Sequence, residues 1–228
     1  GLSKLDSAVQ SYQKAIEINP NYAKAHYNLG NALNELAIMG FEHLDSSIKS
    51  YKKSIEIDPD YAEAHNNLGN VLKDLGQFNE AVSSYQNAIT LQPSYVQAHF
   101  SLGVVLFDLG EFDNAINSYE KAIEINPNFE ELHNKLGNVY REKGQLDLAI
   151  KAYQKALDIN SNYSEVHNNL GNVLRDLGRF DESVHSYKKA IEINPGYPAL
   201  HNNLGNVFKD LGQLDEALKS YLRGLTHN

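Results

Sequence analysis

Residues 62–95 read AEAHNNLGNVLKDLGQFNEAVSSYQNAITLQPSY, and the chain repeats this unit of 34 residues along its length. An aromatic residue ends successive units at a constant step, and these residues are Tyr61, Tyr95, Phe129, Tyr163 and Tyr197. Tyr22 precedes Tyr61 by the same step with five residues inserted. Self-similarity at such a period is typical of a solenoid built from one repeated supersecondary unit.

Each unit predicts two amphipathic helices, called helix A and helix B from here on. With Ala62 as position 1, apolar residues recur at helical spacing in both halves of the unit. Gly76 at position 15 separates the helices, and Pro93 at position 32 cannot continue helix B. Gly69 at position 8 lies inside helix A, where glycine costs about 1 kcal/mol relative to alanine. Because six units retain this glycine, we expect a neighbouring helix too close for a Cβ.

This pattern resembles the tetratricopeptide repeat (TPR) family over the whole chain, with Leu68, Gly69, Leu72, Ala81, Tyr85, Ala88 and Pro93 on family positions. The resemblance implies an all-α, right-handed solenoid of antiparallel helix pairs, thirteen helices in a single array. Residues 2–22 are expected to be a helix B without its own helix A. The predicted repeats span 23–61 with the five-residue insertion, 62–95, 96–129, 130–163, 164–197 and 198–228. Helix A is expected to begin at Ala23, Ala62, Val96, Glu130, Ser164 and Pro198.

Composition argues against several classes of protein. The 20 basic and 29 acidic residues give a net charge of −9, which disfavours binding to nucleic-acid phosphates. Without cysteine there is no disulfide framework or thiol nucleophile, and a reducing, cytoplasmic location is expected. No apolar run is long enough to span a membrane. No motif of an enzyme, cofactor site or metal site occurs, so a non-catalytic chain without cofactor is expected.

Two columns of polar residues could indicate a metal site or a catalytic site. Position 4 carries histidine in six repeats, namely His26, His65, His99, His133, His167 and His201. One histidine per helix A, on helices packed roughly 8–10 Å apart, favours a packing role over a shared metal site. The acidic residues of position 13 also recur, which favours a solvated helix face over a single catalytic pair.

The A helices of TPR proteins line a groove with positions 2, 5, 6, 9, 12 and 13, and here those positions are rich in asparagine. Because an amide both donates and accepts, such a column suits the backbone of an extended peptide. It resembles the asparagine ladder in the TPR arm of O-GlcNAc transferase, which implies a backbone role for Asn28, Asn67, Asn169 and Asn203. Ser101 and Lys135 interrupt that ladder. The alternative is that these asparagines are only uncharged polar residues on a solvent-exposed surface, without a binding role. The remaining polar residues predicted to bind peptide are Asn31, Asn70, Asn138, Asn172, Asn206, Lys73, Arg141, Arg175 and Lys209.

In the repeat where Ser101 interrupts the ladder, positions 5, 9 and 12 hold Phe100, Val104 and Phe107. These three positions form one stripe along helix A. An exposed apolar strip in a groove marks a contact site, whereas the alternative is that both rings pack against adjacent helices. We expect an apolar anchor of the partner here, with the flanking bases attracting acidic groups. The carboxylate-clamp subclass of TPR receptors needs lysine at position 5 and is disfavoured, since that position holds Tyr27 or Asn66, among others.

Three functions remain open from the sequence. The first is a protein-interaction scaffold that binds an extended peptide or a partner helix. The second is the substrate-recruiting arm of a larger enzyme of the O-GlcNAc transferase type, with catalysis outside these residues. The third is a module that associates with itself through its uncapped ends, where Leu214, Leu218 and Tyr221 lack a following repeat, or through the apolar insertion at Ala37–Phe41. For the insertion, the alternative is that helix A runs longer and packs these residues internally.

Overall fold

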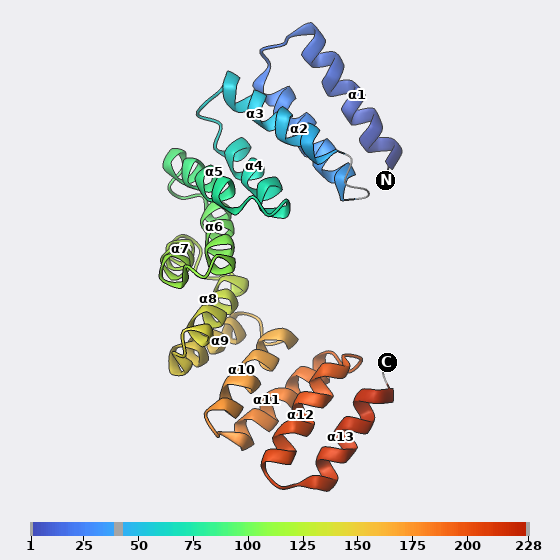
Figure 1. Ribbon diagram of the computed structural model, residues 1–228, viewed down its shortest axis with the longest axis vertical. Helices are drawn as coiled ribbons and strands as arrows, with labels where there is room; N and C mark the ends of the chain where they lie inside the picture. Colours follow the sequence, from blue (N-terminus) through green and yellow to red (C-terminus); the bar gives the residue numbers. More distant parts are fainter. Residues whose placement is uncertain (1, 39–42, 227–228) are drawn as a thin grey trace. The chain divides into compact units, whose positions relative to one another are not determined.

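The computed structural model describes residues 2–38 and 43–226 of the chain. Within those ranges all regular structure is helical, and thirteen helices follow one another (Figure 1). Their bounds are α1 Leu2–Ile18, α2 Ala23–Ala37, α3 Leu44–Ile57, α4 Ala62–Asp74, α5 Phe78–Leu91, α6 Val96–Asp108, α7 Phe112–Ile125, α8 Glu130–Glu142, α9 Leu146–Ile159, α10 Ser164–Asp176, α11 Phe180–Ile193, α12 Pro198–Asp210 and α13 Leu214–Thr226. The predicted all-α class is confirmed, and the helices α2, α4, α6, α8, α10 and α12 begin at the six residues expected for helix A.

The helices pack as the repeat pattern requires. Each helix A packs most extensively on the helix B that follows it, as α4 does on α5. Within each of the two compact units described next, a helix B also packs on the following helix A, as α5 does on α6. The chain divides into two compact units, residues 1–125 and residues 126–228, and each is a stack of such pairs.

A glycine ends helix A at position 15 in five of the repeats. Gly76 has a φ of +73°, and Gly110, Gly144, Gly178 and Gly212 share this left-handed backbone. The N–H of Gly76 donates to the carbonyl of Lys73, and the N–H of Gln77 donates to that of Leu72. This is the Schellman arrangement, which satisfies the last carbonyls of the helix and turns the chain into helix B.

The predicted crowding at the position-8 glycine is made by a tyrosine ring of the paired helix B. A Cβ built on Gly137 would lie 2.5 Å from Cε1 of Tyr153, and one on Gly69 would lie 2.6 Å from Cε1 of Tyr85. Both tyrosines are fully buried. The glycine therefore makes room for the ring that holds the two helices of a repeat together.

The insertion lies largely outside the described residues. Ala37 is buried at the end of α2, and Ile38 after it is 82% exposed. Met39, Gly40 and Phe41 belong to the part of the chain that is not described. Self-association through Ala37–Phe41 therefore stays a prediction.

Candidate functional site

The asparagine of position 9 is held by the tyrosine at position 24 of its own repeat. The tyrosine hydroxyl donates to the asparagine Oδ1 in five repeats, over distances of 2.7 to 2.9 Å. The pairs are Tyr51 with Asn31, Tyr85 with Asn70, Tyr153 with Asn138, Tyr187 with Asn172, and Tyr221 with Asn206. Each amide oxygen thus points inward, and its rotamer is fixed. Tyr221, which the sequence suggested was uncovered, is half-buried against Gly205.

The predicted ladder at position 6 bonds to the preceding repeat. Asn67 donates through Nδ2 to Asn31 Oδ1 at 2.9 Å and to the Tyr27 hydroxyl at 3.1 Å. Asn203 likewise donates to Asn168 Oδ1 at 2.9 Å. The ladder amides that were predicted to hold a partner therefore also join neighbouring repeats. Asn28 is half-buried on α2.

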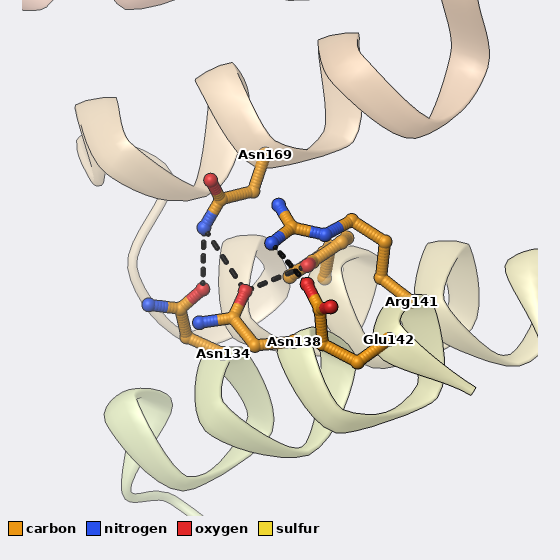
Figure 2. Close-up of polar contacts among 6 residues, drawn as sticks. Asn134, Asn138, Arg141, Glu142 and Asn169 are labelled. Carbon is orange, nitrogen blue, oxygen red and sulfur yellow. Dashed lines mark hydrogen bonds and ion pairs between the residues drawn. The ribbon is translucent and has the colours of Figure 1, made fainter. Parts of the chain in front are cut away.

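Figure 2 shows the same arrangement in the second unit, where Asn169 of α10 points down toward two asparagines of α8. Its Nδ2 lies 3.2 Å from Asn134 Oδ1 and 3.3 Å from Asn138 Oδ1. Asn138 Oδ1 thus accepts from both Asn169 and Tyr153. The network fixes an amide on each side of the junction between two repeats.

Position 5 was predicted to face the groove, but in two repeats the asparagine at this position is buried. Asn66 is 3% exposed and Asn134 is fully buried, so neither amide presents an open surface. Asn134 donates to Glu165 Oε1 at 3.1 Å. Asn66 donates to Asn67 Oδ1, while its own Oδ1 is buried without a hydrogen-bond partner among the described residues.

Three of the bases at position 12 are paired with carboxylates of the chain itself. Lys73 lies 3.2 Å from Asp74, and Arg141 lies 2.8 Å from Glu142. Arg175 Nε donates to Asp210 Oδ2 at 2.6 Å, and this hydrogen bond raises the pKa of the Arg175 guanidinium. Acidic groups of a partner would compete with these carboxylates. Lys209 is exposed on α12.

The apolar stripe of α6 packs partly within its own repeat. The Phe100 ring lies 6.1 Å from the Tyr119 ring between centroids, and the Phe107 ring lies 5.7 Å from the Phe112 ring. Phe100, Val104 and Phe107 are all half-buried. The structure therefore supports the packing alternative and leaves part of each side chain open to contact.

The histidine column fastens the loop before each helix A. In every one of the six repeats the histidine Nε2 lies 2.9 to 3.2 Å from the carbonyl oxygen of the residue at position 32 of the preceding repeat. That residue is proline, except at His167, where it is Ser161. The histidines thus have a structural partner. Within the described residues, no group of three or more histidine and carboxylate side chains is arranged to hold a metal ion.

Several cavities among the described residues lie away from the predicted face. One of about 640 Å³ lies among α1, α2 and α3, with Ile16, His26 and Lys49 in its lining. Others lie between α5 and α7, over α6. Sequence reasoning missed these valleys although helix B carries a signal for them, because serine recurs at position 23 and Ser50, Ser118 and Ser186 line cavities.

A stack of helix pairs with a bonded amide column along its A helices defines a repeat solenoid of the protein-interaction class. The chain belongs to the tetratricopeptide repeat family: the family model described as "TPR repeat" matches residues 2–36, 43–76, 69–110, 105–142, 137–174 and 171–212, and the model described as "Tetratricopeptide repeat" matches 199–228. None of the curated proteins compared with the chain matches it.

Solved structures of TPR proteins share the fold. A crystal structure of MamA is 27% identical, with a TM-score of 0.67, and the match covers 70% of this chain and 94% of that one. YrrB, described as a TPR protein with an unusual peptide-binding site, is 24% identical over 79% of this chain and 93% of its own, with a TM-score of 0.67. PilF of Pseudomonas aeruginosa is 18% identical over 88% of this chain and 89% of its own, with a TM-score of 0.73.

These findings support a protein-interaction scaffold, and such scaffolds are typically non-catalytic. Among the residues that the structure describes, no helix is both long and apolar enough to cross a membrane.

Proposed function

We propose that this chain is a scaffold that binds an extended segment of another protein along its A helices, with the position-9 amides as backbone donors. The observation that carries the proposal is the hydrogen bonding of those amides. Their oxygens accept hydrogen bonds from the position-24 tyrosines, while their Nδ2 groups donate no hydrogen bond within the described ranges. A donor whose direction is fixed before binding loses little side-chain entropy when a peptide carbonyl reaches it.

Each compact unit carries its own set of these donors. Asn31 and Asn70 lie in residues 1–125, and Asn138, Asn172 and Asn206 lie in residues 126–228. The position-6 amides Asn67, Asn169 and Asn203 hold the neighbouring amides in register. A peptide as the partner class is also supported by YrrB, a protein of the same fold described as having a peptide-binding site.

Phe100, Val104 and Phe107 supply the apolar anchor point in this proposal. Their half-buried side chains let the stripe contact a partner without unfolding the repeat. Replacing Phe100 and Phe107 by alanine is expected to abolish capture of a partner peptide while the helical circular dichroism is kept. Unchanged capture by this double variant would remove the anchor from the proposal.

The amide proposal is tested with a peptide selected for binding to this chain from a random dodecapeptide array. Its affinity is measured by fluorescence anisotropy for wild type and for the triple variant Asn138→Ala, Asn172→Ala and Asn206→Ala. Because each neutral hydrogen bond contributes about 0.5–1.5 kcal/mol, the triple variant is expected to bind at least about tenfold more weakly.

A matched control replaces three exposed loop amides of the same unit, Asn128, Asn162 and Asn194, by alanine. This variant is expected to bind like wild type. Equal affinity of the two triple variants, or an array without any binding peptide, contradicts the proposal.

Self-association through α13 is a second proposal, because Leu214 and Leu218 are 67% and 59% exposed on that helix. The expected result is a mass that rises with concentration in light scattering and falls back to that of a monomer in the variant Leu218→Lys. A constant mass equal to one chain would contradict it.

A further inference from the structure

One buried amide of the first unit has an oxygen that forms no hydrogen bond. Asn66 of α4 is 3% exposed, and among the described residues its Oδ1 is the one buried side-chain nitrogen or oxygen without a partner. Its Nδ2 donates to Asn67 Oδ1 at 3.1 Å, so exchanging the two atoms of the Asn66 amide would turn one oxygen toward another. Asn67 is fixed in turn by its bond to Asn31 Oδ1. A buried acceptor without a donor is rare in proteins and calls for an explanation.

Elsewhere on the A helices, the asparagine at position 6 donates to the preceding repeat. Asn67 donates to Asn31 Oδ1 between α2 and α4, and Asn203 donates to Asn168 Oδ1 between α10 and α12. Between α8 and α10 the donor is Asn169 (Figure 2). Each of these junctions lies within one compact unit. The position-6 Nδ2 is therefore the regular donor from one repeat to the repeat before it.

The junction between α4 and α6 has serine at position 6. In the second unit, Asn169 Nδ2 lies 3.2 Å from Oδ1 of Asn134, which holds the same repeat position as Asn66. The residue that corresponds to Asn169 beside Asn66 is Ser101, whose side chain is shorter and carries no amide. The Ser101 hydroxyl forms no bond with Asn66 Oδ1. The same acceptor is thus satisfied where position 6 is asparagine and unsatisfied where it is serine.

Other polar groups surround the place where the asparagine Nδ2 would lie. In the second unit, Asn169 Nδ2 is also 3.3 Å from Asn138 Oδ1, and the corresponding residue of the first unit is Asn70. Asn70 Oδ1 accepts a hydrogen bond from the Tyr85 hydroxyl at 2.9 Å. Burial raises the pKa of Tyr85 and a hydrogen bond with the Ser101 side chain lowers it, which places these two hydroxyls side by side. By this correspondence, two amide oxygens and a serine hydroxyl border one position.

We propose that one water molecule is bound between α4 and α6, at the place that Asn169 Nδ2 takes between α8 and α10. The water donates one hydrogen to Asn66 Oδ1 and the other to Asn70 Oδ1, as the two-hydrogen amide group does in the second unit. The Ser101 hydroxyl rotates to donate a hydrogen bond to the water oxygen. Three hydrogen bonds are about the usual number for a buried water. The ladder thus continues through a bound water where its side chains are interrupted.

The test is a pair of NMR experiments, water NOE and water ROE, on the full chain labelled with 15N. In wild type, the Asn66 side-chain amide is expected to show a cross-peak to water with the sign of a long-lived bound molecule. The Asn134 amide, whose oxygen is already bonded, is expected to show none. In Ser101→Asn the Asn66 cross-peak is expected to disappear, because the new Nδ2 takes the place of the water. In Asn169→Ser a cross-peak is expected to appear at Asn134.

Two variants of similar size check the same site through stability. Asparagine and leucine side chains have nearly the same shape, so Ser101→Asn and Ser101→Leu both exclude the water. Only asparagine supplies a donor to Asn66 Oδ1 in its place. Ser101→Leu is expected to lower the urea midpoint although leucine is the better helix former. Ser101→Asn is expected to keep or raise that midpoint.

Three results would overturn the bound water. They are a wild-type Asn66 amide without a water cross-peak, a cross-peak that persists in Ser101→Asn, and a urea midpoint of Ser101→Leu at or above that of Ser101→Asn. Every measurement is made on the chain without a partner peptide. Failure of this inference is therefore distinguishable from failure of the proposed function.

Discussion

Replacing Gly137 by valine is expected to destabilise the second unit by about 3 kcal/mol, at the upper end of the usual range for an overpacked core. Any Cβ at this position would lie 2.5 Å from Tyr153 Cε1 and 2.6 Å from its Cδ1. The ring is fully buried, and its hydroxyl is bonded to Asn138, so it has no room to withdraw. Without this contact, loss of a helical glycine would stabilise the chain by up to about 1 kcal/mol.

The measurement is urea unfolding followed by circular dichroism, with Gly196→Ala as the matched control. A Cβ at Gly196 would meet no atom within 4 Å, and the backbone there is not left-handed. That control is expected to stay within about 0.5 kcal/mol of wild type. If Gly137→Val unfolds at the same urea concentration as wild type, the glycine is not there to accommodate the ring.

Alkaline pH is expected to unfold the protein through its buried tyrosines. Burial raises the pKa of Tyr187 to about 12 and also raises the pKa values of Tyr51, Tyr85 and Tyr153 well above the ordinary value of 10. Because the unfolded chain loses these protons at lower pH than the folded one, stability is complete below pH 10 and falls as pH rises toward and beyond 12. For Tyr187 alone the shift corresponds to about 3 kcal/mol.

Tyrosinate absorbance and helical circular dichroism, recorded together from neutral pH to beyond pH 12, check this expectation. The loss of helicity is expected to coincide with the last part of the absorbance change, above pH 10, since the buried rings ionise as the helices unfold. The variant Tyr187→Phe is expected to show a weaker dependence on alkaline pH. Full ionisation of all tyrosines near pH 10 with unchanged helicity would disprove the explanation.

The helix pairs could be predicted from the sequence because their signals are local. Apolar periodicity, the glycine at position 15 and the proline at position 32 each act within one repeat, so the start of α4 at Ala62 follows from one unit alone. The crowding at Gly69 was also predictable. That a tyrosine ring causes it was not, because a column of glycines does not say which side chain of helix B reaches it.

The polar contacts between side chains were harder to predict. The bond from Tyr85 to Asn70 has a signal in hindsight, since asparagine occupies position 9 in five of the repeats that carry tyrosine at position 24. Burial of Asn134 has no such signal, because Asn168 and Asn202 at the same position are more open. The ion pair of Arg175 with Asp210 joins two repeats and depends on their relative rotation.

The most direct test of the proposed function is the NMR spectrum of the side-chain amides during titration with the array-selected peptide. The Nδ2 protons of Asn138, Asn172 and Asn206 are expected to shift together, with the Tyr153→Phe variant binding more weakly although Tyr153 itself is buried. Shifts confined to exposed loop amides such as Asn128 and Asn162, with Tyr153→Phe binding like wild type, would contradict the account.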